Sequence, residues 1–438
     1  MADLSTNFAG IKSPNPFWVA SGPPANTGYQ AQRAFEAGWG GVVWKTIGDP
    51  IVNVSSRYSA LHYGPNRLIG FNNIELISDR SPATNFREIA EVKKRWPHHT
   101  VIASLMVGSR EQWHDYVKRS IDAGADGIEL NYGCPHGMCE RGMGSAVGQQ
   151  PAVAEKITSW VMEVATIPVI VKLTPNITDV TAAARAAKRA GAHAISLINT
   201  INSITNVNLD TFVPEPTVGH QSSHGGYCGP AVKPIALNMV QACAADPDVR
   251  LPISGIGGIA NWRDAAEFLA LGSTSLQVCT AIMHYGFRIV EDMNEGLSAY
   301  LDSTGMKSIN DLIGRAVPSL NKWENLNLNY QRVARIDYDK CIGCNLCYNA
   351  CEDGAHQCID LKNPDEVTTT LGPGRVPHKP IPQVREADCV GCNLCSLVCP
   401  VDDCITMVNL PNDKPAMSWS NYQERLAAGT MQPIPPHP

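Results

Sequence analysis

Short runs of β-branched and other apolar residues recur along the chain up to about residue 300, and each run is followed by a stretch with apolar residues at helical spacing. The stretches 87–96, 182–194 and 261–272 show this helical spacing clearly. The pattern predicts a regular alternation of strands and helices. The predicted strands are 17–22, 40–46, 101–106, 127–131, 169–174, 194–200, 252–258 and 275–280.

Eight strands alternating with helices over about 250 residues favour a (β/α)₈ TIM barrel over a doubly wound sheet. In such barrels the functional residues lie at the C-terminal ends of the strands and in the loops that follow. Two of these loops are unusually long, 47–100 after the second strand and 201–229 after the sixth. Loops of this length are often lids or binding loops, so we expect both to border the active site.

The pattern changes after the barrel, which we assign to residues 1–302. Residues 303–335 are polar and predict a helical or irregular connector, and residues 336–410 are dominated by cysteines. Residues 411–438 end in the proline-rich MQPIPPHP, which predicts an extended tail. The fold class is therefore an α/β barrel followed by a small α+β domain.

Composition narrows the possible partners. Charged residues make up 17% and hydrophobic residues 44% of the 438 residues, which indicates a compact protein with much of its chain buried. The net charge of −6 comes without a long run of like charges, so we expect no nucleic-acid and no membrane partner. The N-terminus lacks the pattern of an export signal, so we expect a cytoplasmic protein, with a small molecule or another protein as its partner.

Eight of the fifteen cysteines form two runs of the pattern C-x₂-C-x₂-C-x₃-C. This is the spacing of bacterial ferredoxins with two [4Fe–4S] clusters, in which the fourth cysteine of each run ligates the other cluster. Zinc is the alternative, but zinc sites usually use separated pairs of cysteines. We expect Cys358 and Cys404, outside the spacing, to be packing residues. The expected ligands are Cys341, Cys344, Cys347 and Cys399 for one cluster, and Cys389, Cys392, Cys395 and Cys351 for the other.

A glycine run, 255–260, follows the seventh predicted strand and matches the dinucleotide-binding pattern G-x-G-x-x-A. That pattern also requires an acidic residue at the end of the next strand, where this chain has Cys279 and Thr280. In a barrel, the loops after strands seven and eight commonly bind a phosphate through backbone N–H groups. The sequence therefore favours FMN over NAD as the bound nucleotide.

Several segments together carry a resemblance to a known family. They are FNNIELISDR (71–80), ELNYGCPHGMCERGMG (129–144), VKLTPNITD (171–179), INT (198–200), GGYCGPAVKPIAL (225–237), GIGGI (255–259), LQVCTAI (276–282) and both cysteine runs. The chain resembles, over about residues 1–410, the FMN- and iron–sulfur-containing, pyrimidine-reducing subunits of NAD-dependent dihydropyrimidine dehydrogenases. Its barrel is similar to that of the dihydroorotate dehydrogenases.

The resemblance implies a set of FMN-binding residues. Lys172 is expected beside the N1/O2 edge of the flavin, where its ammonium stabilises the anionic reduced form. Gly257, Gly258, Cys279 and Thr280 are expected around the phosphate. The remaining implied FMN contacts are Ala20, Ser21, Lys45, Thr46, Asn73, Asn131, Asn199 and Gly229.

The resemblance also implies a pyrimidine site built from side-chain amides. An amide offers a donor and an acceptor in fixed geometry, and uracil presents alternating N–H and C=O groups. The implied substrate residues are Asn73, Glu75, Asn131, His136, Asn199 and Thr200.

Cys134 is the implied catalytic acid. Hydride transfer to C6 of uracil leaves an enolate that needs a proton at C5, and an ordinary thiol, with a pKa of about 8.5, is mostly protonated at neutral pH. A nucleophilic pair with His136 is conceivable but lacks an acyl substrate. The family often has a serine before this cysteine, whereas this chain has Gly133.

The implied function is that of an oxidoreductase, the catalytic subunit of NAD-dependent dihydropyrimidine dehydrogenase, acting on uracil or thymine. Because the chain has no convincing NAD site, a flavoprotein subunit that binds FAD and NAD is the implied partner, in a hetero-oligomer. Two alternatives remain open: a dihydroorotate dehydrogenase-type enzyme, and a non-catalytic electron-transfer subunit.

Overall fold

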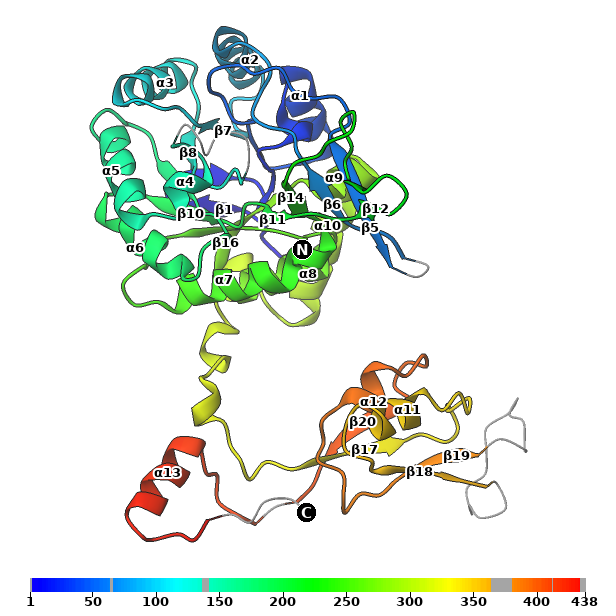
Figure 1. Cartoon of the computed structure of the whole chain (residues 1–438). Helices are drawn as coiled ribbons and strands as arrows, with labels where there is room; N and C mark the ends of the chain where they lie inside the picture. Colours follow the sequence, from blue (N-terminus) through cyan, green and yellow to red (C-terminus); the bar gives the residue numbers. More distant parts are fainter. Residues whose placement is uncertain (1, 64–65, 136–141, 364–379, 412, 434–438) are drawn as a thin grey trace. The chain divides into compact units, whose positions relative to one another are not determined.

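The computed structural model describes residues 2–63, 66–135, 142–363, 380–411 and 413–433. The chain divides into two compact units, Met1–Leu320 and Asn321–Pro438 (Figure 1). The first part of the predicted connector, up to Leu320, thus belongs to the barrel unit. Among the described residues, no helix is both long and apolar enough to cross a membrane.

The first unit contains a closed barrel of parallel strands, which confirms the predicted TIM barrel (Figure 1). All eight predicted strands are present, and each neighbours the next in chain order. They are β3 (Phe17–Val19), β4 (Gly41–Val43), β7 (Thr100–Leu105), β8 (Gly127–Asn131), β9 (Val169–Lys172), β10 (Ala194–Leu197), β15 (Ile253–Ile256) and β16 (Ser273–Val278).

Helices surround the barrel (Figure 1). In α6, Ala183, Ala184 and Ala187 are buried at helical spacing, and the Asp179 carboxylate caps the first turn by accepting the Thr181 N–H. The helices of this unit are α1 (Gly28–Ala37), α2 (Pro82–Arg95), α3 (Arg110–Asp122), α4 (Ser145–Gly148), α5 (Pro151–Met162), α6 (Val180–Arg189), α7 (Lys233–Ala245), α8 (Trp262–Ala270), α9 (Thr280–Tyr285) and α10 (Ile289–Ser303).

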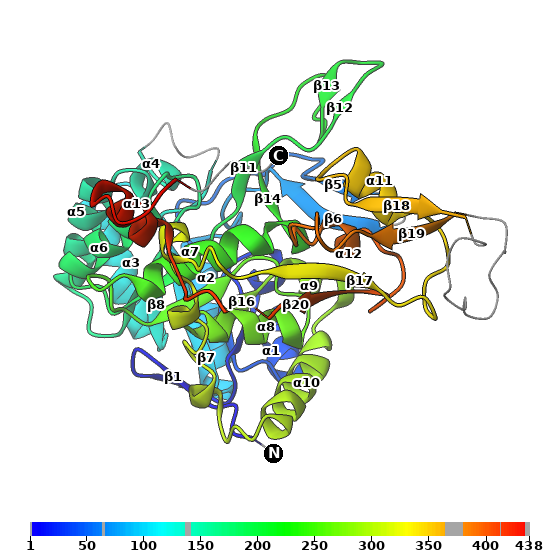
Figure 2. The same cartoon turned by 90° about the horizontal axis from the view of Figure 1, so that it is seen from below.

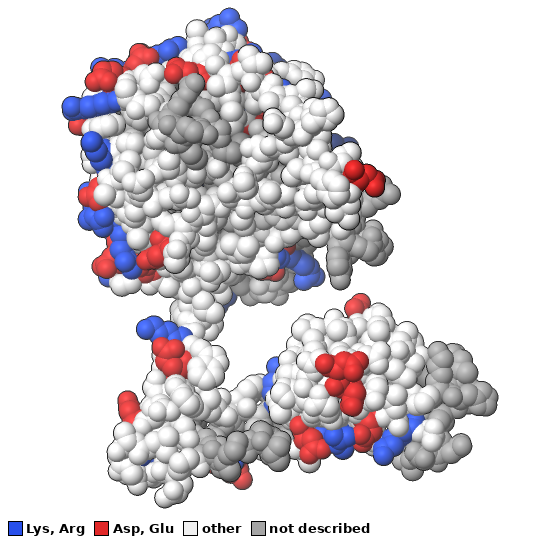
Figure 3. Space-filling model, viewed as in Figure 1, with Lys and Arg blue, Asp and Glu red and all other residues white. Residues whose placement is uncertain are grey.

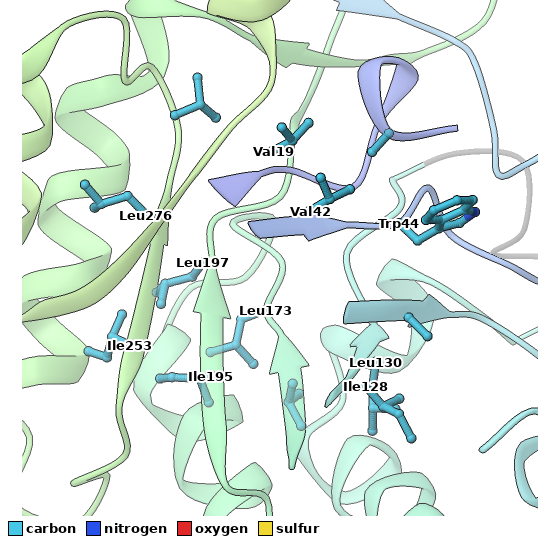
Figure 4. Close-up of a cluster of buried hydrophobic side chains, with 14 of the residues drawn as sticks. Val19, Val42, Trp44, Ile128, Leu130, Leu173, Ile195, Leu197, Ile253 and Leu276 are labelled. Carbon is cyan, nitrogen blue, oxygen red and sulfur yellow. The ribbon is translucent and has the colours of Figure 1, made fainter. Parts of the chain in front are cut away.

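The main core lies between the strands and these helices, and Figure 4 shows Val42, Leu130, Leu197 and Leu276 among its members. A second apolar cluster closes the N-terminal end of the barrel. There the hairpin of β1 (Thr6–Phe8) and β2 (Ile11–Ser13) places Phe8 edge-on against Trp18, with ring centroids 5.5 Å apart. The barrel is therefore filled at this end, which leaves the opposite end for a site.

The two long loops build a second sheet together. Strands β5 (Tyr58–Tyr63) and β6 (Asn66–Asn73) come from the first loop, and β11 (Ile201–Ser203) and β14 (Gly225–Cys228) from the second. They form one antiparallel sheet in the order β11-β14-β6-β5. The second loop also forms the hairpin of β12 (Val207–Asn208) and β13 (Val213–Pro214), which projects from the barrel in Figure 2.

Charged side chains of the barrel unit gather along its outer helices in the view of Figure 3, and the middle of this face is largely uncharged. Lysine and arginine alternate with aspartate and glutamate there, and several form ion pairs such as Arg110–Glu163 and Arg189–Glu155. Exposed pairs of this kind contribute little to stability, and they leave no patch of one sign on this face.

The second unit has the duplicated, ferredoxin-like organisation that the cysteine runs predict. Strands β17 (Arg332–Ile336) and β20 (Ile405–Asn409) pair antiparallel, as do β18 (Ile359–Lys362) and β19 (Ile381–Val384). Each cysteine run leads into a short helix, α11 (Leu346–Glu352) or α12 (Leu394–Leu397). In both runs a left-handed asparagine, Asn345 or Asn393, precedes the helix, so the two runs fold alike.

The prediction of an extended tail over 411–438 is wrong for part of the segment, because Trp419–Ala427 form helix α13. Ser418 caps this helix by accepting the Asn421 N–H, and Tyr422 is buried. Trp419 packs on Trp323, with ring centroids 6.1 Å apart. Local capping and aromatic packing thus outweigh the breaking effect of the prolines that flank the helix.

Candidate functional site

Two adjoining cavities open at the C-terminal end of the barrel. The first has about 900 Å³ of empty space and lies among the ends of β3, β9, β10, β15 and β16 and the antiparallel sheet. The second has about 530 Å³ and lies beside the ends of β4 and β8. Residues Ser21, Gly22, Pro23, Asn73, Asn199 and Thr200 line both cavities.

The first cavity brings together most of the residues expected to bind FMN. Lys172, at the end of β9, is 3% exposed and lies on its wall. Ala20, Gly229, Gly257, Gly258, Cys279 and Thr280 line the same cavity. Lys45, Thr46 and Asn131, also expected at the flavin, instead line the second cavity.

A tight glycine turn follows β15 at one end of the first cavity. Gly257 and Gly258 have φ angles of 127° and 77°, a region that favours glycine. A Cβ on Gly258 would lie 2.9 Å from the Lys233 backbone nitrogen and 3.0 Å from the Gly229 carbonyl oxygen. The turn therefore requires glycine. Nearby, burial raises the pKa of the Cys279 thiol to about 12, so this thiol is neutral at physiological pH.

The shape and lining of the first cavity fit a flavin nucleotide. Tyr58, Phe71 and Tyr227 of the antiparallel sheet supply aromatic walls, as an apolar ring system requires. A buried lysine and a glycine turn line the same space, which suits a molecule with an electron-accepting ring and a phosphate.

The second cavity brings together the described residues expected at the substrate. Asn73, Glu75, Asn131, Asn199, Thr200 and Cys134 all line it. The remaining expected residue, His136, lies outside the described residues.

The protein fixes the orientation of two of these amides. The Asn131 Nδ2 group donates to the Thr46 hydroxyl at 2.9 Å, and its Oδ1 accepts the Gly133 N–H at 3.1 Å. The Asn73 Oδ1 accepts the Glu75 N–H at 2.9 Å. Because an amide oxygen has two lone pairs and an amide nitrogen two N–H groups, each side chain retains hydrogen-bonding capacity toward a ligand.

A buried charged cluster borders the second cavity. The Glu75 Oε1 lies 2.6 Å from the Lys45 ammonium and 3.0 Å from the Arg57 guanidinium. The Tyr58 hydroxyl donates to Glu75 Oε2. Burial is the main cause that raises the pKa of Tyr58, and this hydrogen bond is the second. One carboxylate is thus shared by two cations beside the cavity and offsets only part of their charge.

Cys134 is 8% exposed and packs with Ile77, Met106 and Met143. Its carbonyl accepts the Ser145 N–H at 2.9 Å, which ties the loop after β8 to the start of α4. The residue before Cys134 is Gly133, where the family often has a serine, and the position of Asn199 explains this difference. A Cβ on Gly133 would lie 2.4 Å from the Asn199 Cβ, so only glycine admits Asn199 at its present position.

Cysteines of both runs meet in the second unit. One cavity is lined by Cys351, Cys389, Cys392 and Cys395, which combine three cysteines of the second run with the fourth of the first, and by Cys358 from outside the runs. On the other side, the Cys404 thiol interacts with both Cys341 and Cys399. Among the described residues, no three metal-binding side chains converge on a single ion. Cysteines placed around a space suit the corners of a cubane cluster, with the fourth ligands exchanged as the spacing predicts.

Comparison with protein-family models decides the family. The model for dihydroorotate dehydrogenase matches residues 3–301, which is the barrel together with its cavities. The chain belongs to the dihydroorotate dehydrogenase family. This assignment makes the barrel unit that of a flavin-dependent oxidoreductase. A second model, the 4Fe-4S dicluster domain, matches residues 334–407, so this family member also carries an iron–sulfur domain.

Curated relatives of this family member include two dihydropyrimidine dehydrogenases. The NAD-dependent dihydropyrimidine dehydrogenase subunit PreA of Escherichia coli K12 is 45% identical over 360 residues, covering 82% of this chain and 87% of the relative. The chloroplastic dihydropyrimidine dehydrogenase (NADP(+)) of Arabidopsis thaliana is 39% identical, covering 72% and 77%. The dihydroorotate dehydrogenase B (NAD(+)) catalytic subunit of Pyrococcus abyssi is 36% identical, covering 72% and 99%. The expected family resemblance is confirmed.

Sequence reasoning missed several residues that line the site of this dihydroorotate dehydrogenase family member. Tyr58, Phe71 and Tyr227 come from the antiparallel sheet, whose pairing of two distant loops is not visible in the sequence. Arg57, directly before β5, reaches the site through its ion pair with Glu75. Glu129 and Gln277 lie inside the barrel and were read as parts of buried strands. A charged residue within the apolar run 127–131 was the signal that could have identified Glu129.

Proposed function

We propose that the chain is the catalytic subunit of an NAD-dependent dihydropyrimidine dehydrogenase that reduces the C5=C6 bond of uracil or thymine. The observation that carries the proposal is the pair of adjoining cavities, one suited to a flavin and the other lined by amides and Cys134. The names of the Escherichia coli and Arabidopsis relatives, both dihydropyrimidine dehydrogenases, support the same reaction class.

FMN is the proposed nucleotide of the first cavity, and when bound it would supply hydride to C6 of the pyrimidine. Lys172 is proposed to stabilise negative charge on the ring, since its ammonium is buried on the cavity wall. Gly257, Gly258, Cys279 and Thr280 are proposed to surround the phosphate. Ala20, Ser21 and Gly229 would complete the cavity.

The second cavity is proposed to hold the pyrimidine ring. Asn73, Asn131, Asn199 and Thr200 would orient it through hydrogen bonds to its N–H and C=O groups. Orientation is the main contribution of such residues, because it removes the entropy cost of aligning the reacting atoms during each turnover. The bonds from Asn131 to Thr46 and Gly133 hold one amide in place before substrate binds.

Cys134 is proposed to deliver the proton to C5. It lines the same cavity as the amides, and its surroundings, Ile77, Met106 and Met143, are apolar. These neighbours exclude water from one side of the thiol, which favours direct proton transfer to the substrate. In the reverse reaction the thiolate would take the same proton back.

The second unit is proposed to carry two [4Fe–4S] clusters that relay single electrons to the flavin. The proposed ligands are Cys341, Cys344, Cys347 and Cys399 for one cluster, and Cys351, Cys389, Cys392 and Cys395 for the other. Because the similar Escherichia coli protein is named a subunit, we further propose a cytoplasmic hetero-oligomer in which a flavoprotein partner binds FAD and NAD.

The proposal is tested by reducing the purified chain with light under anaerobic conditions and then adding uracil or orotate. Return of the oxidised flavin band with uracil, together with dihydrouracil formation, supports the proposal. Return with orotate alone would assign dihydroorotate chemistry instead. A flavin that responds to neither ligand, or purified chain without flavin, would favour a non-catalytic electron-transfer subunit.

A further inference from the structure

A fully buried carboxylate lies inside the barrel, close to the first cavity. Glu129, on β8, has 0% exposure. Its Oε2 accepts hydrogen bonds from the Ser196 hydroxyl at 2.8 Å and from the Gln277 Nε2 group at 2.9 Å. These two donors come from β10 and β16, so strands from three parts of the barrel fix the carboxylate.

The other oxygen of this carboxylate faces the ammonium group of Lys172. Among the described residues, Glu129 Oε1 accepts no hydrogen bond, and the Lys172 ammonium lies 3.7 Å from it. The Lys172 ammonium donates no hydrogen bond within the described part of the chain, and Lys172 lines the first cavity. The lysine is therefore held by charge from one side while its N–H donors remain available to a ligand.

We propose that Glu129 is a positioning residue that anchors Lys172 and limits the positive charge that the lysine offers to the cofactor. The inference rests on the proposed FMN site. A buried lysine without a counter-charge would be costly, and a buried carboxylate without a cation equally so. The pair satisfies both requirements, and its long separation lets the ammonium turn toward the flavin without leaving its anchor.

Replacement of Glu129 by glutamine keeps the shape of the side chain and an acceptor for Ser196, but removes the charge. The Lys172 ammonium is then no longer attracted by Glu129, so it stabilises negative charge on the flavin more strongly. Sulfite provides the probe, since it adds to flavin N5 and places negative charge on the pyrimidine part of the ring. We expect the sulfite dissociation constant of the FMN-loaded Glu129→Gln protein to fall about 10-fold, measured by bleaching of the visible band.

Two further variants test whether Glu129 acts through its charge on Lys172 or only supports the structure. Glu155→Gln makes the same chemical change on the outer helix α5, where Glu155 pairs with Arg189, and is expected to leave sulfite affinity unchanged. In a Lys172→Met background the charge that Glu129 is proposed to restrain is absent, so adding Glu129→Gln is expected to change sulfite affinity less than about threefold.

The outcomes distinguish this inference from the proposed function. Wild-type chain that binds no FMN would overturn the proposed function itself. Wild-type chain that binds FMN and sulfite, with Glu129→Gln unchanged or weaker in sulfite binding, would overturn the role of Glu129 alone. If the single variant fails to fold, the folded double variant and Lys172→Met still decide the matter, because a difference above threefold between them contradicts the restraint.

Discussion

The two units of this chain differ in how far their cores depend on the residues expected to bind cofactors. In the barrel unit, a large aliphatic and aromatic core holds strands whose ends already form both cavities. In the second unit, six of the nine buried residues of the core cluster are cysteines. The barrel therefore builds its site from an independent core, whereas the second unit needs its clusters to complete a core. Cofactor removal should affect the two units very differently.

Removing the iron–sulfur clusters should have the largest effect. We expect iron chelation under oxidising conditions to abolish amide protection of strands β17, β18, β19 and β20, because the cysteines then lose the two clusters that join the runs. Protection of the barrel strands should persist. Hydrogen exchange followed by mass spectrometry on the full chain measures both units at once. Stable protection of these four strands in cluster-free protein would contradict the comparison. Removal of flavin, which should leave the barrel strands protected, is the matched control.

A methyl group on Gly133 should disturb the preformed barrel site without unfolding it. In Gly133→Ala the new Cβ would lie 2.4 Å from the Asn199 Cβ, so Asn199 must move. We expect the KM for uracil to rise about 10- to 100-fold, with normal FMN content. Gly108→Ala is the matched control, since its nearest contact would be an ordinary 3.6 Å from the Met143 sulfur. Equal kinetics in the two variants would mean that Asn199 does not set substrate affinity.

Glu75 provides a second test of the preformed barrel site, because its ion pairs with Lys45 and Arg57 are present before any ligand binds. Glu75→Gln leaves Lys45 and Arg57 without their shared carboxylate beside the second cavity. We expect uracil affinity to fall about 10-fold and orotate, which carries a carboxylate, to become a better inhibitor. Competition assays with both pyrimidines measure the change. Unaltered discrimination would show that the cluster is structural, and Glu163→Gln, on an exposed pair with Arg110, controls for loss of a carboxylate.

The smallest effect is expected at a cysteine outside the two runs. Cys358 lies against the ligand set, with its backbone N–H donating to the Cys351 sulfur at 3.2 Å. Its thiol donates to the Asp388 carbonyl at 2.9 Å, as a packing residue would. Cys358→Ser should therefore keep both clusters, whereas Cys351→Ser should lose one. Iron content and electron paramagnetic resonance distinguish the two variants, and loss of a cluster in Cys358→Ser would make this residue a ligand.

The sequence allowed the strands of the barrel to be predicted because each is a short apolar run buried on both sides. It did not reveal the antiparallel sheet, whose strands β6 and β14 pair residues such as Asn73 and Gly226 from loops far apart along the chain. The positions of Tyr58, on the wall of the first cavity, and of Arg57, paired with Glu75, are not predictable from the sequence for this reason. Glu75 was found through the family resemblance, but its two cations were not.

The cysteine runs were more informative, because ligand spacing within a short segment is a local property. The helix Trp419–Ala427 was overlooked although its cap, Ser418 with Asn421, is equally local, since the neighbouring prolines suggested an extended segment. Glu129 shows the limit of strand patterns. A single polar residue in an apolar run signals a partner, but only the closed barrel identifies Lys172 as that partner.

The central claim is that this chain reduces the pyrimidine at the barrel site, with Cys134 as the acid. A single-turnover experiment with wild-type and Cys134→Ala chain, photoreduced under anaerobic conditions and mixed with uracil, tests it most directly. The account predicts that the variant retains flavin and clusters but reoxidises with uracil at least about 100-fold more slowly, with correspondingly little dihydrouracil. Reoxidation of Cys134→Ala at the wild-type rate, with dihydrouracil formed, would contradict the account.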